Sequence, residues 1–325
     1  MCFLADMAVN IKRIGHPTHL GEGPQWSPEE QVLYYTDILE SSIFRYDPKT
    51  NTETSIKLGG GNLSIVIPVE GKKNQFVITL ERNIAVLTWD GNSPKPEKLE
   101  IISSVEKLET KCPTTNFNDG KADPVGRLWA GTLEKGGYSH KTIPEQCALY
   151  NFSKDGTPTL KVSGITLSNG MAWSSDKKTM YYTDTPTFKI FAFDYDAPTG
   201  NITNRRVVFD MYKDFLTEGP DGKTVGPDGM TIDSEDKLWL ATFGSSKVLR
   251  IDPATGKVIS TVTVPSPEVT SVAFGGKNLD ELYVTSANIL NDTELTKKYP
   301  DAGYTFRVTG LGVKGLPAKN VILSR

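Results

Sequence analysis

Six short segments of similar composition recur along this 325-residue chain, and their spacing constrains the fold more than any other feature. In chain order they are LYYTD at Leu33, FVITL at Phe76, LWAGT at Leu128, MYYTD at Met180, LWLAT at Leu238 and LYVTS at Leu282. Successive segments begin 43, 52, 52, 58 and 44 residues apart. Runs of aromatic and β-branched residues between turn residues are typical of strands, and this spacing is near that of a four-stranded propeller blade.

A further strand-like run follows each segment, and the runs are IFRYD, IAVLTWD, ALYNFS, IFAFDYD, VLRID and YTFRV. Turns rich in Asp, Pro and Gly often come next, as at Asp47, Asp196 and Asp252. These repeats predict an all-β fold, a closed six-bladed β-propeller that occupies residues 1–325 as one domain. The sequence leaves open whether NIKRIG near Ile11 or NVILS near Ile322 supplies the strand that closes the ring.

Composition excludes several classes of partner. The net charge is −3 with no Lys/Arg block, which argues against an electrostatic nucleic-acid partner. No apolar run reaches the roughly 18 residues of a membrane span, and the N-terminus lacks the pattern of a signal peptide. Cys2, Cys112 and Cys147 have no metal-type spacing, which is typical of thiols in a reducing compartment. We expect a cytoplasmic protein with a small-molecule substrate; its oligomeric state is open, and a monomer is compatible with the sequence.

Polar residues recur where the strand before each repeated segment begins. Counting back 10 or 11 residues from the segment reaches a carboxylate or carboxamide in four of the six copies, and the matching places in the other two lie near a hydroxyl residue. The four are Glu22, Asn118, Asn169 and Asp228, and the hydroxyl residues are Ser64 and Thr270. Because this strand is the innermost one of a propeller blade, the pseudo-symmetry predicts that the four side chains meet at one mouth of the axial channel.

The same residues could be ordinary turn formers, since Asn-Gly and Asp-Gly are strong hairpin signals. However, each of these four copies has its own later turn, at SSDKK, DSEDK, DPVGR or SPEEQ, so the polar residue lies at the entrance of a strand. An oxygen-only set with two carboxylates suits hard cations such as Ca²⁺, Mg²⁺ or Mn²⁺ and leaves Zn²⁺ open. The pattern therefore predicts a metal site in the central channel.

Several segments resemble a known family. LGEGPQW from Leu20, NDGKADPVGRLWAGT from Asn118, SNGMAWS from Ser168 and PDGMTID from Pro227 are similar to the hallmark segments of the regucalcin (senescence marker protein), gluconolactonase and luciferin-regenerating enzyme family. The resemblance covers nearly the whole chain in the right order. The C-terminal stretch VTSVAFGGKNLDELYVTSA is particularly similar to the insect members, including firefly luciferin-regenerating enzyme.

This resemblance implies a six-bladed propeller with one divalent cation, for which Ca²⁺ is our first expectation and Zn²⁺, Mg²⁺ and Mn²⁺ are the alternatives. It implies that Glu22, Asn169 and Asp228 are the metal ligands. Asp228 would also be the catalytic proton acceptor and donor, and Asn118 would contact the substrate or a metal-bound water. Family members hydrolyse sugar lactones, and regucalcin is also described as a calcium-binding regulator.

The chain departs from the family at Asn116, where regucalcins carry Arg, and Glu134 is its only candidate for an acidic substrate contact that the family has nearby. Asn is a shorter and neutral contact in place of a charged, forked donor. We therefore expect a metal-dependent hydrolase of a lactone or similar cyclic acyl compound, in which Asn116 and Asn118 orient the substrate. The alternatives are hydrolysis of oxyluciferin or an organophosphate, and a calcium-binding regulatory protein without turnover; a propeller that serves only as an interaction scaffold is disfavoured.

Overall fold

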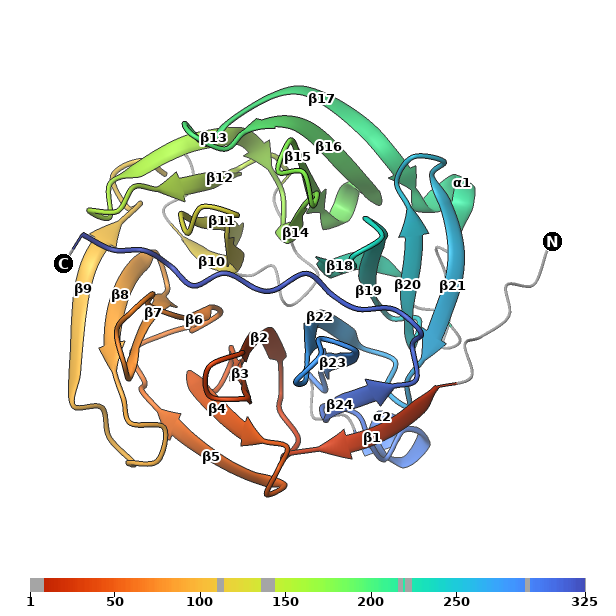
Figure 1. The fold of residues 1–325 in the computed structure, drawn as a ribbon, viewed down its shortest axis with the longest axis horizontal. Helices are drawn as coiled ribbons and strands as arrows, with labels where there is room; N and C mark the ends of the chain where they lie inside the picture. The colour runs from red at the N-terminus through yellow and green to blue at the C-terminus, as the bar shows by residue number, and fades with distance from the viewer. Residues whose placement is uncertain are drawn as a thin grey trace.

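The computed structural model describes residues 9–109, 114–135, 144–215, 219, 224–289 and 293–324. Within these residues, 24 strands form six four-stranded antiparallel sheets. The sheets are arranged as blades around one axis (Figure 1). The predicted all-β, six-bladed propeller is therefore confirmed.

Each blade runs from an inner strand at the axis to an outer strand at the rim, and the blades are numbered 1–6 from the one that contains β2. The inner strands are β2 (Gly21–Ser27), β6 (Val66–Pro68), β10 (Thr115–Ala122), β14 (Ser168–Trp173), β18 (Gly226–Ile232) and β22 (Val269–Gly275). The second strands are β3 (Val32–Asp37), β7 (Gln75–Leu80), β11 (Leu128–Glu134), β15 (Thr179–Asp184), β19 (Leu238–Phe243) and β23 (Glu281–Ser286). These second strands contain the six repeated segments of the sequence.

The third and outer strands complete the blades. The third strands are β4 (Ser42–Asp47), β8 (Asn83–Thr88), β12 (Cys147–Phe152), β16 (Lys189–Asp196), β20 (Lys247–Asp252) and β24 (Thr305–Thr309). The outer strands are β5 (Thr52–Lys57), β9 (Lys98–Ser104), β13 (Pro158–Ile165), β17 (Asn201–Asp210), β21 (Lys257–Thr263) and β1 (Asn10–Ile14). Short helices occur at α1 (Met211–Asp214), α2 (Thr293–Lys298) and the 3₁₀ turn η2 (Thr185–Thr187).

The hydrophobic core lies between the blades. Six clusters of buried apolar side chains each join two neighbouring blades, so that every blade packs on both faces. Trp129 and Trp173 meet edge to face across blades 3 and 4 with ring centroids 6.0 Å apart. Trp26 stacks on Tyr283 across blades 1 and 6 at 5.4 Å. Burial of these large rings is the main force that holds the ring of blades together.

A threonine that recurs in the repeated segments links the inner strands. Its six copies are fully buried, and they are Thr36, Thr79, Thr132, Thr183, Thr242 and Thr285. The Thr183 hydroxyl of blade 4 lies 3.2 Å from Gly170 O of its own blade and 3.3 Å from Asp228 O of blade 5. This second contact ties the backbone of one predicted site residue to the neighbouring blade.

The N-terminal strand closes the ring. β1 pairs with β24 over five positions, from Asn10 opposite Thr309 to Ile14 opposite Thr305, so blade 6 combines the N-terminal strand with β22, β23 and β24. The other candidate, near Ile322, has a different role. Val321 forms an isolated parallel bridge with Val69 of blade 2, at the end of a segment that crosses the centre of the ring in Figure 1.

The positions of the cysteines and the lengths of the helices can be compared with the sequence expectations. Cys147 lies buried in β12, while Cys2 and Cys112 are outside the described residues. Among the described residues, the helices are all too short and too polar to cross a lipid bilayer.

A buried aspartate organises the hairpin of blade 5. Asp233 accepts hydrogen bonds from Trp239 Nε1 at 2.9 Å, Arg250 Nε at 2.8 Å and the backbone N–H of Lys237 at 2.9 Å. Arg250 also pairs with Glu235 at 2.7 Å, but the side chain of Glu235 is 60% exposed whereas that of Asp233 is 0% exposed. Blade 3 repeats the buried arrangement, because Trp129 Nε1 donates to an aspartate, Asp123, at 3.0 Å.

We predict that Asp233→Ala lowers the free energy of unfolding by about 3 kcal/mol, because it removes the buried partner of Trp239 and leaves the largely buried Arg250 guanidinium partly unpaired. The matched control is Glu235→Ala, which removes the exposed partner of the same guanidinium and should cost less than about 1 kcal/mol. Urea unfolding followed by circular dichroism measures both values. Equal losses in the two variants would contradict the assignment of Asp233 as the organising residue.

Candidate functional site

Four predicted residues line one cavity at an end of the axial channel. The cavity has a volume of about 320 Å³, and Glu22, Asn118, Asn169 and Asp228 all contribute to its wall. They come from the inner strands β2, β10, β14 and β18, and all four are buried. The propeller geometry thus brings together residues that are more than 200 positions apart in the chain.

A β-bulge occurs at this position in each of the four strands. The pairing register with the second strand shifts between Glu22 and Gln25, Phe117 and Gly120, Asn169 and Met171, and Pro227 and Met230. A bulge adds a residue to one strand, bends it and redirects its side chains. The following glycine allows the close approach: a Cβ on Gly170 would lie 2.5 Å from Asp228 O.

The side chain of Asn169 is oriented by a short chain of hydrogen bonds. Its Nδ2 donates to Thr185 Oγ1 at 3.1 Å, and Thr185 Oγ1 in turn donates to Pro227 O at 2.8 Å. The amide oxygen of Asn169 is buried and accepts no hydrogen bond from the described residues. The arrangement therefore presents an oriented but unsatisfied acceptor, which is unfavourable unless a ligand or an ion completes it.

Two carboxyl groups share this buried environment. The pKa of Glu22 is raised well above its usual range by burial and then by the charges of Asp228 and Asp119. The pKa of Asp228 is likewise raised, by burial and then by Asp119, while hydrogen bonding from Asn169 and from the Gly229 N–H partly offsets the rise. Asp228 Oδ1 is a second buried acceptor without a partner among the described residues. Like charges in a desolvated site repel each other. A bound cation would relieve both this repulsion and the cost of burying the charged carboxylates.

Asp119 is a third buried carboxyl that the sequence reasoning missed. It lines the narrow part of the channel with Gly23, Lys121 and Ser271, and its Oδ1 accepts from the Gly120 N–H at 2.7 Å. Burial raises its pKa, and the positive charge of Lys121 opposes that rise. Simple strand alternation assigns only one of two adjacent residues to the axis. The bulge in β10 places both Asn118 and Asp119 there, and the only sequence signal was the Asp within the NDG motif.

The donor set fits a divalent cation that prefers oxygen ligands. Glu22 and Asp228 supply carboxylates, Asn169 supplies an amide oxygen, and two of these oxygens lack a partner within the described residues. The part of the chain that the structure describes contains no group of three or more His, Cys, Asp or Glu side chains arranged as metal ligands. A cation here would therefore depend on the amide of Asn169 as well as on the two acids, as in oxygen-rich sites for hard cations.

The rest of the described cavity wall is mostly apolar. It is formed by Leu20, Leu167, Pro186, Phe188, Phe243 and Ile289, together with Thr185, Thr224 and Gly226. Asn118 is fixed at the polar end, where its Nδ2 donates to Ser168 O at 2.8 Å. The site is thus a polar floor beneath a mostly hydrophobic entrance, an arrangement common in small-molecule pockets.

Two other candidate substrate residues lie differently. Asn116 is buried in β10 opposite Leu133 of β11, and it is not among the described residues that line the cavity. Its Nδ2 is a buried donor that has no partner in the described part of the chain. Glu134 ends β11 and is also absent from the described cavity wall.

The fold and the site define a class of protein: a six-bladed propeller with buried acidic and amide side chains at one end of its channel. Residues 20–288 match the family model described as "SMP-30/Gluconolactonase/LRE-like region", and the chain belongs to this family. It is 41% identical over 308 residues to regucalcin of Danio rerio, which covers 94% of this chain and 95% of the relative. It is 35% identical over 301 residues to regucalcin of Homo sapiens, with 91% and 92% covered.

Solved structures agree with this assignment. A luciferin-regenerating enzyme superposes with a TM-score of 0.89 at 39% identity, covering 97% of this chain and 100% of that one. A regucalcin from Agrobacterium tumefaciens, described as a calcium-binding protein, has a TM-score of 0.81 at 26% identity and covers 95% of each chain.

We predict that Asp228→Asn stabilises the metal-free protein at pH 8. Raised folded-state pKa values mean that the folded protein holds these protons more tightly than the unfolded chain does. The contribution of these two groups to stability should therefore be most favourable below the unfolded-state pKa of about 4 and should fall as the pH rises through the folded-state values. Removing the Asp228 charge should raise the midpoint of thermal unfolding at pH 8, and the gain should shrink toward pH 4.

The control for this experiment is Asp194→Asn. Asp194 is half exposed, and its pKa is lowered by hydrogen bonds from Asn204 and Arg206, so its replacement should bring no stabilisation. Differential scanning calorimetry of chelator-treated protein at several pH values makes the comparison. A midpoint at pH 8 that is lower for Asp228→Asn than for the unmodified chain would contradict the like-charge interpretation.

Proposed function

We propose that this protein is a divalent-metal-dependent hydrolase that opens a lactone or a similar cyclic acyl compound. The observation that carries the proposal is the pair of buried acceptors, Asn169 Oδ1 and Asp228 Oδ1, that lack a partner among the described residues of the site. The family to which the chain belongs includes gluconolactonases by its description, which supports the same reaction class.

The cation would be held by Glu22, Asn169 and Asp228. When bound, a divalent cation supplies charge stabilisation for the oxyanion that develops as an ester carbonyl is attacked. Ca²⁺ is the first choice, because a relative 26% identical to this chain is described as a calcium-binding protein; Zn²⁺, Mg²⁺ and Mn²⁺ are the alternatives. An oxygen-only ligand set supports Ca²⁺ over metals that prefer nitrogen or sulfur.

Asp228 would be the general base and then the general acid. A water oxygen forms a bond to the carbonyl carbon, and Asp228 accepts the proton that the water loses. As the ring C–O bond breaks, the same proton passes to the leaving alkoxide, so the product is an open-chain hydroxy acid. Asn118, held by its bond to Ser168 O, would orient the substrate. Asn116, the second residue predicted for this role, has a buried Nδ2 donor but is not among the described residues that line the cavity.

The apolar entrance favours a substrate with a hydrophobic substituent. A sugar lactone carries a hydroxyl on most ring carbons, whereas Phe188, Phe243 and Ile289 provide no hydrogen-bonding side chains to receive them. Asn116 is neutral where regucalcins carry Arg, and the missing charged, forked donor also disfavours a polyhydroxylated substrate. Hydrolysis of oxyluciferin is the second candidate, supported by the similarity to a luciferin-regenerating enzyme. A calcium-binding regulatory protein is the third, supported by the regucalcin relatives.

We predict that Thr185→Val weakens metal binding by about tenfold to a hundredfold, as the loss of a residue that orients a ligand typically does. The matched control is Thr187→Val in the same 3₁₀ turn, since Thr187 Oγ1 donates only to Asp184 O, at 2.7 Å, among the bonds described. Calorimetric titration with calcium chloride measures both affinities. Unchanged affinity in Thr185→Val would show that the orientation of Asn169 is irrelevant to the metal.

The main test compares turnover of an alkyl-substituted δ-lactone, glucono-δ-lactone and oxyluciferin. We expect hydrolysis that is lost in chelator, recovers with a divalent metal, and is fastest for a substrate with an apolar substituent. Asp228→Ala should reduce kcat by about 10²–10⁴, the usual contribution of a general base, while Asp176→Ala on an exposed hairpin turn should leave it unchanged. Tight Ca²⁺ binding without turnover of any of the three would favour the regulatory protein. Turnover that survives both the chelator and Asp228→Ala would refute the proposed mechanism.

A further inference from the structure

A second cavity lies at the opposite end of the same channel. The inner strands that carry the candidate active site continue for three or four residues and then line a space of about 260 Å³. β10, for example, contributes Asn118 to the first cavity and Lys121 to the second. Strands β2, β14, β18 and β22 also contribute to the second cavity, so five blades surround it. The narrow part of the channel that contains Asp119 separates the two ends.

The C-terminal segment, residues 314–324, forms a strap across this end (Figure 1). One side is anchored by the N–H of Gly315, which donates to Leu279 O at 2.7 Å. The other side is anchored by the N–H of Val321, which donates to Pro68 O at 3.0 Å. Between the anchors, residues 316–319 line the cavity, which is therefore bounded by the blades and by the strap.

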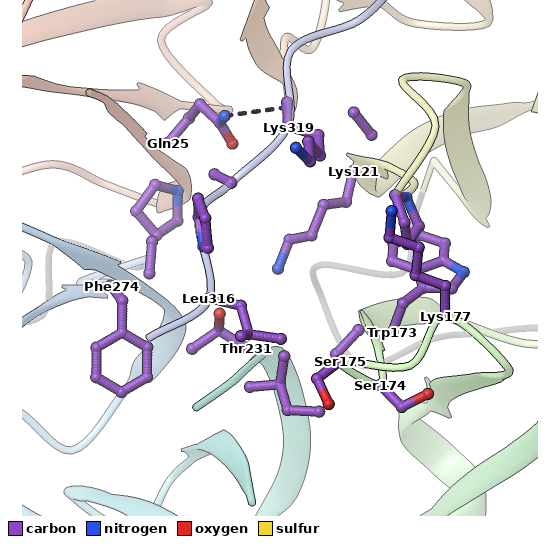
Figure 2. Close-up of a pocket in the computed structure, with 18 residues that line it drawn as sticks. Gln25, Lys121, Trp173, Ser174, Ser175, Lys177, Thr231, Phe274, Leu316 and Lys319 are labelled. Carbon is purple, nitrogen blue, oxygen red and sulfur yellow. Dashed lines mark hydrogen bonds between the residues drawn. The ribbon is translucent and has the colours of Figure 1, made fainter. Parts of the chain in front are cut away.

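Lys121 reaches into this cavity from β10. Figure 2 shows its side chain extending from the strand toward the middle of the space. Its Nζ donates to Met230 O at 2.7 Å, which uses one of the three N–H groups of the ammonium. Burial lowers the pKa of Lys121, and the charge of Asp119 opposes that change. Asp119 lines the narrow part of the channel together with Lys121, and it lies outside the described wall of this cavity. Within that wall the ammonium has no anionic partner among the described residues, and a buried charge gains from one.

The described cavity wall is positive. Besides Lys121 it contains Lys177 and Lys319, both exposed at the rim, and the described lining residues include no Asp or Glu. The strap is held near this point by Gln25, whose Nε2 lies 3.4 Å from Lys319 O (Figure 2). Two aromatic residues, Trp173 and Phe274, add apolar surface to the wall.

Two acidic side chains lie near this cavity, and each accepts a hydrogen bond from a serine of its wall. Asp176 accepts from Ser174 Oγ at 2.6 Å, and Asp236 accepts from Ser175 Oγ at 2.7 Å. The hydroxyl groups of Ser174 and Ser175 are therefore directed to these aspartates. The cationic character of the described cavity wall therefore comes from its three lysines, Lys121, Lys177 and Lys319.

We propose that this second cavity is a binding site for a small organic anion, a carboxylate or phosphate attached to an apolar ring. Lys121 would bind the anionic group in the depth of the cavity, Lys177 and Lys319 would add charge at the rim, and Trp173 and Phe274 would contact the ring. The volume, about 260 Å³, is slightly below the usual range for small-molecule pockets of roughly 300–1,000 Å³, which restricts the ligand to a compact molecule. This site does not depend on the hydrolytic activity proposed for the other end.

The test is calorimetric titration of the full-length protein with phenyl phosphate and with its neutral analogue benzyl alcohol, at constant ionic strength. Four proteins are compared: the unmodified chain, Lys121→Met, the double variant Lys177→Gln/Lys319→Gln, and Asp228→Asn at the opposite mouth. We expect binding of phenyl phosphate alone. Lys121→Met should weaken it at least tenfold and the rim variant severalfold, while Asp228→Asn should bind as the unmodified chain does.

Any of four results would overturn the proposal. Equal affinity in Lys121→Met would show that the buried ammonium is not involved. Loss of binding in Asp228→Asn would place the probe at the candidate metal site, and comparable binding of benzyl alcohol would show that charge is irrelevant. If Lys121→Met fails to fold, the rim variant decides, because Lys177 and Lys319 are exposed; unchanged affinity there also overturns the proposal.

Discussion

The packing of six inner strands around one axis is the constraint on which the rest of this structure depends. The large aromatic and aliphatic side chains fill the spaces between blades, and this burial draws the inner strands close together. Close approach is possible only where side chains are small, as at Gly170, whose Cα faces the backbone of Asp228. Thr183 then ties the two blades together through its hydroxyl. The candidate active site is a consequence of this geometry, because polar groups on separate blades can converge only at the axis.

Convergence at the axis also concentrates charge in a poorly solvated place. In the metal-free protein burial raises the pKa values of Glu22, Asp119 and Asp228; the charges of Asp228 and Asp119 add to the rise at Glu22, and that of Asp119 adds to the rise at Asp228. Lys121 has the opposite charge and lies farther along the channel. The channel is therefore acidic at one end and basic at the other. These charged groups destabilise the ligand-free protein, but they could bind a cation at one end and an anion at the other. Such a loss of stability is expected at functional sites rather than at purely structural positions.

Membership of the family explains the scaffold, while the chain's own residues bear on specificity. The propeller and the polar floor of the first cavity are compatible with the reaction class that the family description includes. The apolar entrance, formed in part by Phe188 and Phe243, is the feature from which we infer a hydrophobic substrate. A fold shared with many relatives cannot decide that question, which is why the proposed tests compare substrates rather than structures.

Local pattern was sufficient for much of this protein. The repeated segments and their spacing predicted six blades, and the counts back to Glu22, Asn118, Asn169 and Asp228 identified four residues that share a cavity. These signals are local because strand alternation and turn propensity depend on consecutive residues. Their roles as ligands and as a general base stay predictions.

Tertiary structure decided the features that depend on distant partners. Both terminal segments have strand-like sequences, and β1 closes the ring because it pairs with β24, whereas Val321 pairs with Val69 instead. The bulge that brings Asp119 to the axis arises where β10 meets its neighbour, and no single strand's sequence encodes it. The same holds for the strap and for the cavity that Lys121 enters. The physical reason is that pairing and packing between remote segments are properties of the assembled ring, whereas periodicity belongs to each strand alone.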